Sequence, residues 1–436
     1  MKRNLTLSVI VLLVAGASAA AAASSTRRHR PTPLPAPVWY VETLAGEAVE
    51  SQRGDDPINP ASVVKVATSL WALERLGPDF RYETRFFARG RVDGARRVLV
   101  GDLVVEGGGD PDFHAENAFL VAKALNDLGV ERVSGALVVN ARFWIGWENG
   151  SAGRMADPVK RGLQMAARLR QALDPKRWNW ATRATWREFS ARRGLSYSHP
   201  ARVAVAGGIG TNGHVDGGAM LVVHRSEPLV DALRRFNCYS NNDIERVAAG
   251  LGSAADLAGL VATKCELPAD GVQIETASGL GSNRLTPHGI VRLLRELRTT
   301  CARTNVSVEA LLPVAGCDPG TVTRFFPVLS EGADSTAVVG KTGTLTNTDG
   351  GVAVLAGFVN TGSGEYAFCV AVPHAAGRLR SARKLEEQWL TTFIAGHGGG
   401  RPHTCAPALS MPDASAVVIR VGADGAASPT PAAAQH

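Results

Sequence analysis

Residues 62–77 read SVVKVATSLWALERLG and predict the first long helix of the chain. Apolar residues recur along it at helical spacing, and Gly77 is typical of a helix end. Ser62 and Lys65 stand three residues apart, so their side chains share one face of this helix. A lysine whose pKa is lowered by burial or by another cation can take the proton of a serine hydroxyl. The pattern allows a serine nucleophile with a lysine base, although alone it fits a solvent-exposed lysine better.

A second polar segment, Lys341-Thr342-Gly343-Thr344, follows the apolar run Ala337–Gly340. The run predicts a strand that becomes polar at its end. A lysine there supplies positive charge for a substrate carboxylate and could help to lower the pKa of Lys65, and the glycine lets a substrate backbone approach closely. Taken alone, a solvent-exposed strand end is the better explanation of this segment.

A third segment, Ser240-Asn241-Asn242, lies in a predicted turn between the helical stretches Leu229–Cys238 and Asp243–Leu251. Capping of the second stretch explains it and does not exclude catalysis. The three segments occur in the order Ser-x-x-Lys, Ser-x-Asn, Lys-Thr-Gly, on a helix, a loop and a strand. This order is the signature of penicillin-recognising serine enzymes and class A β-lactamases.

Beyond these motifs, the sequence resembles the D-alanyl-D-alanine carboxypeptidase/endopeptidase family of low-molecular-mass class C penicillin-binding proteins. The resemblance extends over about residues 38–394. The segments that carry it are Asn59-Pro60-Ala61-Ser62-Val63-Val64-Lys65, Gly101-Asp102-Leu103, Gly107-Gly108-Gly109-Asp110-Pro111, Tyr239-Ser240-Asn241-Asn242, Ala277-Ser278-Gly279-Leu280 and Asn283-Arg284-Leu285.

The resemblance implies a serine-type carboxypeptidase that acts on peptidoglycan stem peptides, with DD-endopeptidase activity as an extension, through an acyl-enzyme that β-lactams also form. No cofactor and no metal are implied, and the histidines lack ligand spacing such as His-Glu-x-x-His. The implied catalytic residues are Ser62 as nucleophile, Lys65 as proton acceptor, Ser240 as proton shuttle, Asn242 as holder of Lys65 and the substrate amide, and Lys341. The implied substrate-binding residues are Thr342, Gly343 and Thr344, with the backbone N–H groups of Ser62 and Thr344 as the oxyanion hole.

The implied fold is α/β (α+β), an antiparallel sheet with flanking helices joined to an all-helical lobe, with an inserted β-rich domain. We expect a signal peptide at 1–23, a linker at 24–37, the penicillin-binding domain at 38–81 and 225–395, the insert at 82–224 and a low-complexity tail at 396–436, without regular structure except where Cys405 is tied down. The insert is short for the family and should diverge most over Trp144–Arg193. Asn347-Thr348-Asp349-Gly350-Gly351 is a small local insertion near the cleft.

Two other functions share these features. A β-lactamase carries the same motifs, but the predicted strand-rich segment Tyr82–Val139 argues against one. A catalytically silent wall-binding scaffold of the same fold is disfavoured because folding alone does not demand all five polar motif residues. A phosphate-binding loop at Gly107–Pro111 is excluded, since no Gly-Lys-Ser/Thr follows and the proline lacks an N–H donor.

The N-terminus predicts export. Two basic residues precede the apolar run Leu5–Ala15 and the small-residue stretch Gly16–Ala23, which is the order of a cleaved signal peptide. A retained membrane anchor is the alternative, but the apolar run is short for a spanning helix. The expected product is extracytoplasmic or periplasmic, without stable membrane insertion.

Charge and composition restrict the partners. The chain has 436 residues, 45% hydrophobic and 20% charged, which is typical of a globular protein of two or three domains and excludes a disordered or fibrous one. Its net charge of +7 comes from 47 Lys and Arg against 40 Asp and Glu. These residues form no clustered footprint for nucleic acid. The partners expected are therefore peptidoglycan peptides, with β-lactams as inhibitors.

The six cysteines all lie in the second half of the chain and form no Cys-x-x-Cys pair. Export permits disulfides. Pairing between neighbours in sequence favours Cys238–Cys265 and Cys301–Cys317, and buried free thiols are the alternative.

Overall fold

The computed structural model describes residues 34–147, 157–211, 218–332, 334–421 and 428–429. The predicted signal peptide and most of the predicted linker lie outside the described residues. Within them, no helix is both long and apolar enough to cross a membrane.

A five-stranded antiparallel sheet carries the Lys-Thr-Gly segment. Its strand order is β10-β11-β12-β1-β2, so β10 is an edge strand. The strands are β1 (Val38–Thr43), β2 (Ala48–Gln52), β10 (Val338–Leu345), β11 (Val352–Thr361) and β12 (Gly364–Pro373). The central strands are apolar at nearly every position because helices cover both faces of the sheet.

Alternate residues of β11 serve the two faces, as the two-residue period of a strand requires. Val354 and Phe358 belong to the hydrophobic cluster that includes α1 (Val64–Leu76) and α8 (Pro287–Arg303). Leu355 and Val359 belong to the opposite cluster with α11 (Leu379–Gly396). The same cluster includes residues of α9 (Thr321–Phe325) and α10 (Pro327–Glu331).

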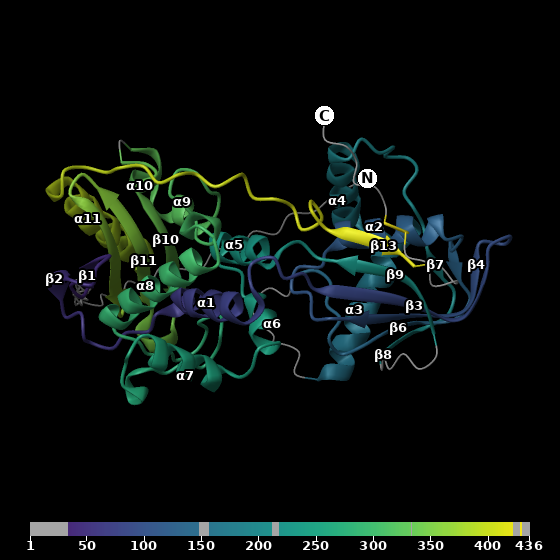
Figure 1. The fold of residues 1–436 in the computed structure, drawn as a ribbon, viewed down its shortest axis with the longest axis horizontal. Coiled ribbons are helices and arrows are strands. Elements are labelled where there is room, and N and C mark those ends of the chain that lie inside the picture. Colours follow the sequence, from purple (N-terminus) through teal and green to yellow (C-terminus); the bar gives the residue numbers. More distant parts are fainter. Residues whose placement is uncertain (1–33, 148–156, 212–217, 333, 422–427, 430–436) are drawn as a thin grey trace, which may run out of the picture. The chain divides into compact units, whose positions relative to one another are not determined.

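Helix α1 is buried on all sides over most of its length, in contrast to an amphipathic surface helix. Helix α8 packs against it, as do α5 (Leu229–Tyr239), α6 (Ile244–Ala249) and α7 (Ala254–Lys264). The 3-10 turn just before α1 packs against β10 and β11. Figure 1 shows α1 among these helices. The start of α1 therefore lies between the sheet and a group of helices.

Seven strands of a second, nine-stranded sheet come from the segment between α1 and α5 (Figure 1), and the C-terminal segment supplies the other two. Its long strands β3 (Glu83–Asp93), β4 (Val98–Gly107) and β9 (Ala219–Arg225) are antiparallel. Short strands extend it in parallel: β5 (Arg132–Val133), β6 (Leu137–Val139), β7 (Ala204–Val205) and β8 (Ile209–Thr211).

Helices also belong to this region, and one of them lies where strands were predicted. The part of the insert that was expected to diverge most contains α3 (Pro158–Leu173) and α4 (Trp180–Arg192). The expectation of strands throughout 82–139 is wrong at α2 (Ala115–Asp127). Helix α2 is rich in alanine and buries one face in the cluster under the nine-stranded sheet, which favours helix over strand.

The C-terminal segment also differs from the expectation. Instead of an irregular tail after residue 396, β13 (Val417–Arg420) adds to the nine-stranded sheet beside β9, as the yellow strand in Figure 1 shows, and β14 (Ser428–Pro429) pairs with it. Asp413, fully buried, pairs with Arg192 and Arg193. This extended segment is rich in Gly, Ala and Pro and has no hydrophobic period that would predict a strand. Its hydrogen bonds are made with elements far away in the sequence.

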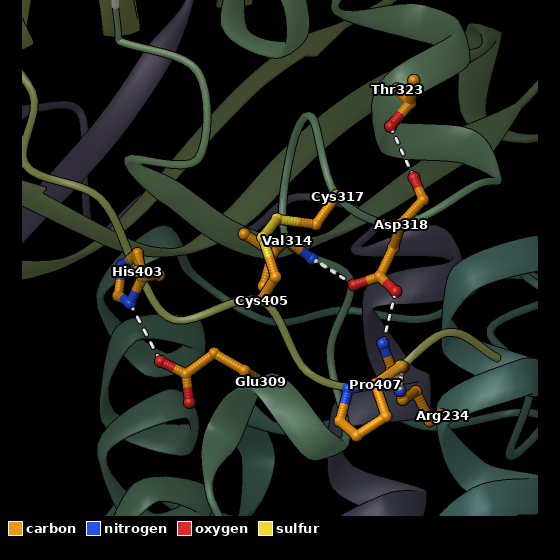
Figure 2. The surroundings of a disulfide bond; sticks show 9 residues. All are labelled: Arg234, Glu309, Val314, Cys317, Asp318, Thr323, His403, Cys405 and Pro407. Atoms are coloured by element: carbon orange, nitrogen blue, oxygen red, sulfur yellow. Dashed lines mark hydrogen bonds and ion pairs between the residues drawn. A yellow bond between two sulfur atoms is a disulfide. The ribbon is translucent and has the colours of Figure 1, made fainter.

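The disulfide connectivity predicted from sequence neighbours is wrong. Cys317 pairs with Cys405, 88 residues away, and the other four cysteines are buried thiols. Figure 2 shows the surroundings: Arg234 donates to the Pro407 carbonyl, and its guanidinium also pairs with Asp318, next to Cys317. The return of the C-terminal segment across the molecule, which the sequence does not signal, sets this pairing.

Candidate active site

Residues 59–65, the predicted nucleophile segment, contain a strained backbone. Ala61 has a φ of 47°, which is uncommon for a residue other than glycine, and its N–H donates to Asn59 Oδ1 at 3.0 Å. Ser62 follows in a short 3-10 turn (Ala61–Val63) that continues into α1, and it is partly exposed. Gly279, with a φ of +85°, contacts this backbone so closely that a Cβ there would lie 1.8 Å from the Ala61 carbonyl oxygen. The Ser-Gly-Leu segment thus packs directly against the nucleophile segment.

Lys65 is fully buried one turn into the helix. Its Nζ lies 2.9 Å from Ser62 Oγ, 2.8 Å from Asn242 Oδ1 and 2.7 Å from the Ser278 carbonyl oxygen. Burial, reinforced by the positive charge of Lys341, holds the pKa of Lys65 well below its usual value, and Glu245 opposes this in part.

The lowered pKa of Lys65 favours the neutral amine, which has two N–H donors and one lone pair for these three contacts. The Ser278 carbonyl and the Asn242 amide oxygen can only accept, so they take the two N–H groups. The lone pair is then directed at the Ser62 hydroxyl. This arrangement lets Lys65 accept the serine proton.

Ser240 lies at the end of α5 in the left-handed conformation, with a φ of 55° and a ψ of 39°. Its Oγ is 3.0 Å from Lys341 Nζ, which also donates to the Thr342 carbonyl at 2.8 Å. Lys341 is fully buried, and this burial lowers its pKa to about 7. A second lysine in the site can therefore exchange a proton near neutral pH.

The exposed edge of β10 supplies backbone donors. Gly340 N–H donates to the Pro313 carbonyl at 3.0 Å, and the Val338 carbonyl accepts from Ala315, so these two residues direct their backbone groups away from β11. Because backbone groups alternate in direction along a strand, the N–H and C=O groups of Thr342 and Thr344 also point away from β11. Gly343 contacts the nucleophile segment, since a Cβ there would lie 2.5 Å from the Pro60 carbonyl oxygen. The Thr344 N–H is thus available beside Ser62 as an oxyanion donor.

The structure brings together every residue that the motifs predicted: Ser62, Lys65, Ser240, Asn242 and Lys341, with Thr342, Gly343 and Thr344 along β10. It tests their positions and not their catalytic roles, which stay predictions. Among the described residues, no group of three or more His, Cys, Asp or Glu side chains is placed to hold a metal.

Several contacts in the site were not predicted. Thr342 Oγ1 donates to Thr321 Oγ1 at 2.7 Å, and Arg383 donates to Thr344 Oγ1 at 3.0 Å. Glu245 accepts the Ser278 N–H at 2.6 Å and so orients the carbonyl that Lys65 contacts. Thr321 and Arg383 belong to no local motif. The segment Ala277-Ser278-Gly279-Leu280, which resembles the family, was the one sequence signal that could have indicated a role of Ser278 in the site.

Comparisons with solved structures show the fold. A predatory endopeptidase from Bdellovibrio bacteriovorus, in complex with an immunity protein, aligns with a TM-score of 0.72 at 19% identity over 91% of this chain and 100% of that one. Penicillin-binding protein 4 from Haemophilus influenzae aligns with a TM-score of 0.58 at 19% identity over 83% of this chain and 97% of that one. These similarities confirm the predicted fold class.

Sequence comparisons give the family. A D-alanyl-D-alanine carboxypeptidase from Actinomadura sp. (strain R39) is 37% identical over 97 residues, which is 22% of this chain and 18% of that enzyme. The model of the D-Ala-D-Ala carboxypeptidase 3 (S13) family matches residues 36–158 and 187–392, most of the chain. The match confirms the resemblance drawn from the motifs, and the chain belongs to the D-Ala-D-Ala carboxypeptidase 3 (S13) family.

Proposed function

We propose that this chain is a serine-type D-Ala-D-Ala carboxypeptidase that acts on peptidoglycan stem peptides through an acyl-enzyme. The observation that carries the proposal is the environment of Lys65. Its buried Nζ has two pure acceptors for its N–H groups and lies 2.9 Å from Ser62 Oγ. Because burial also lowers the pKa of Lys65, these contacts hold a neutral amine, which is the form that a general base requires.

In the first half-reaction, Ser62 Oγ attacks the carbonyl carbon of the penultimate D-Ala while its proton passes to Lys65. The backbone N–H groups of Ser62 and Thr344 stabilise the oxyanion, each contributing about 3 kcal/mol in comparable sites. As the C–N bond breaks, the proton held by Lys65 passes through Ser240, which lies 3.0 Å from Lys341 Nζ, to the leaving amine, and Lys65 is neutral again. Water then attacks the ester carbonyl and gives a proton to Lys65. Lys65 returns this proton to Ser62 Oγ as the ester C–O bond breaks and the peptide leaves.

Recognition of the substrate carboxylate falls to the β10 edge. Lys341 contributes positive charge, and Thr342 and Thr344 contribute hydroxyl groups. Arg383, which donates to Thr344 Oγ1, adds a cation that the motifs did not indicate. Asn242 holds the substrate amide while its side-chain oxygen accepts from Lys65.

Endopeptidase activity needs only a different leaving amine at the same acyl donor, so we propose it as a second reaction of this site. Structures of predatory endopeptidases from Bdellovibrio bacteriovorus, one of them acylated by penicillin G, support both this reaction and acylation of Ser62 by β-lactams. At 20% identity they support it through the shared fold.

We further propose an extracytoplasmic location. It is supported by the signal-peptide pattern at residues 1–23, by the Cys317–Cys405 disulfide and by the peptidoglycan substrate. Secretion of the full chain into a periplasm or medium, with cleavage near residue 23, would test it through the N-terminal sequence of the mature protein.

The function is tested with a synthetic peptide that ends in D-Ala-D-Ala, by measuring D-alanine release from the oxidised protein and from Ser62→Ala. We expect release by the wild type and none by the variant. Rapid, sustained hydrolysis of benzylpenicillin without peptide cleavage would instead indicate a β-lactamase. A folded protein that neither cleaves peptide nor binds penicillin would indicate a silent scaffold.

A further inference from the structure

The insertion Asn347–Gly351, between β10 and β11, has a fixed shape. Asp349 is in the left-handed conformation, with a φ of 55° and a ψ of 30°. Gly350 and Gly351 also have positive φ, and their carbonyl groups accept from Ala376 and Ala375 at 2.8 and 3.0 Å. The segment is therefore bound to the chain that follows β12, and Asp349 projects from a rigid turn.

The carboxylate of Asp349 contacts Arg284 and Asn59, and Asn59 belongs to the segment directly before Ser62. Arg284 donates to both of its oxygens, at 2.7 and 2.9 Å, and Asn59 Nδ2 donates to Oδ2 at 2.6 Å. The hydrogen bonds from Arg284 and Asn59 lower the pKa of Asp349 to about 2, so this carboxylate is ionised at neutral pH.

Asn59 connects this carboxylate to the nucleophile segment. Its side chain is 4% exposed, and its second amide N–H donates to the Gly281 carbonyl at 2.8 Å. With both N–H groups used, its Oδ1 is left to accept the Ala61 N–H at 3.0 Å. Ala61 is the residue with positive φ directly before Ser62. A continuous series of contacts thus leads from Asp349 through Asn59 to the backbone of the nucleophile.

We propose that Asp349 is a positioning residue, which fixes the orientation of the Asn59 amide and thereby the backbone that presents Ser62 Oγ and the Ser62 N–H. The proposal rests on the proposed function, because it concerns the acylation step. Asp349 does not touch the reacting atoms. It acts through the Asn59–Arg284–Asp349 cluster, to which the Ser-x-x-Lys, Ser-x-Asn and Lys-Thr-Gly motifs do not contribute.

Loss of the carboxylate should affect acylation more than binding. Without Asp349, one Asn59 N–H loses its acceptor, and the amide no longer has a single preferred orientation. The strained Ala61 then loses a fixed partner for its N–H. The β10 residues that recognise a substrate carboxylate, Lys341 and Thr342, keep their contacts. Since a small displacement of a nucleophile costs on the order of 10²-fold in rate, we expect the chemical step to slow.

The test compares Asp349→Ala with a matched ion pair at the opposite end of the same sheet. Arg298 and Glu365 have side chains 38% and 20% exposed, close to the 37% and 25% of Arg284 and Asp349. The acylation rate constant and the dissociation constant of the preceding complex are measured with a fluorescent penicillin, by stopped flow, on full-length oxidised protein. We expect a 10- to 100-fold lower rate constant for Asp349→Ala with the dissociation constant within about twofold, and unchanged values for Glu365→Ala.

The conservative variant Asp349→Asn sharpens the result and serves if Asp349→Ala does not fold. Its side-chain oxygen can still accept from Asn59, but it loses the charge that pairs with Arg284, so we expect an intermediate rate. Because Asp349 is ionised over the whole range from about pH 5 to 9, the ratio of wild-type to variant rates should not change with pH.

The outcomes separate the two proposals. A wild type that penicillin does not acylate would contradict the proposed function. If penicillin acylates the wild type, and Asp349→Ala and Asp349→Asn are acylated at the wild-type rate, the positioning role is overturned and the proposed function is left intact. Equal losses in Asp349→Ala and Glu365→Ala, or a loss confined to the dissociation constant, would also overturn it.

Discussion

The surroundings of Ser62 and the interior of the nine-stranded sheet are both buried, but their side chains differ in kind. Around Ser62, two fully buried lysines contact oxygen atoms of the motif residues, and Ala61 and Ser240 have strained backbones. Under the nine-stranded sheet, rings such as Phe113 and Phe143 meet edge to face with centroids 5.6 Å apart. Burial of lysine and positive φ cost stability, whereas apolar packing provides it.

This difference indicates that the first region is built for chemistry and the second for stability. Substitutions in the two regions should therefore separate: those near Ser62 change acylation in a folded protein, and those in the second cluster change folding while the folded fraction stays active.

The largest effect is expected for Lys65→Met, which keeps the volume of the side chain and removes the base. The rate of acylation by penicillin should fall between about 10²- and 10⁴-fold, because general base catalysis of this kind contributes that much. Circular dichroism and thermal melting should show a folded protein. Acylation at the wild-type rate would contradict the role of Lys65 as the proton acceptor.

The opposite pattern is expected for Phe113→Ala. The ring is fully buried, so its removal should lower the free energy of unfolding by about 3–5 kcal/mol. The acylation rate constant, corrected for the folded fraction, should match that of the wild type. Chemical denaturation and stopped-flow acylation measure the two quantities, and a loss of rate in fully folded variant would show that the two regions are not separable.

A smaller effect on stability is expected from the disulfide. Cys405→Ser should lower the free energy of unfolding by about 2–4 kcal/mol, because the bridge closes a long loop. Reductant should destabilise the wild type to the same extent and leave Cys405→Ser unchanged, which provides the control. If reductant destabilises both proteins equally, the Cys317–Cys405 bridge is not the stabilising element.

The smallest effect concerns pH. Burial lowers the pKa of Lys341 from 10.5 to about 7, so between these values the unfolded chain binds more protons than the native one, and stability should rise with pH. One such lysine adds at most about 1.4 kcal/mol per pH unit. Denaturation at pH 7.5 and 8.5 should show a smaller rise in Lys341→Met than in the wild type. Equal rises would mean that Lys341 is not desolvated in the native state.

The sequence predicted the parts of the site that depend on local spacing. Ser62 and Lys65 meet because they stand three positions apart at the start of a helix, and Lys341 lies where an apolar strand becomes polar. Contacts that depend on the return of distant segments were not predictable. Thr321, Arg383 and the partner of Cys317 are brought into place by tertiary packing, which leaves no periodic pattern or motif in the chain.

The fold shows the same limit. The long helix α1 and the apolar start of strand β10 were indicated by period and composition. Helix α2 lies in a segment whose flanking strands dominated the pattern, and β13 takes its partner from β9, nearly 200 positions earlier. Asp349 belongs to a segment that was predicted from the sequence to be a small insertion, but its contact with Asn59 is visible only in the structure.

The most direct test of the account locates the covalent adduct. Oxidised, folded protein is treated with a fluorescent penicillin, digested, and analysed by mass spectrometry beside Ser62→Ala. The account predicts an adduct on the peptide that contains Ser62, absent from the variant. An adduct on another residue, or none on the folded wild type, would contradict the claim that Ser62 is the nucleophile.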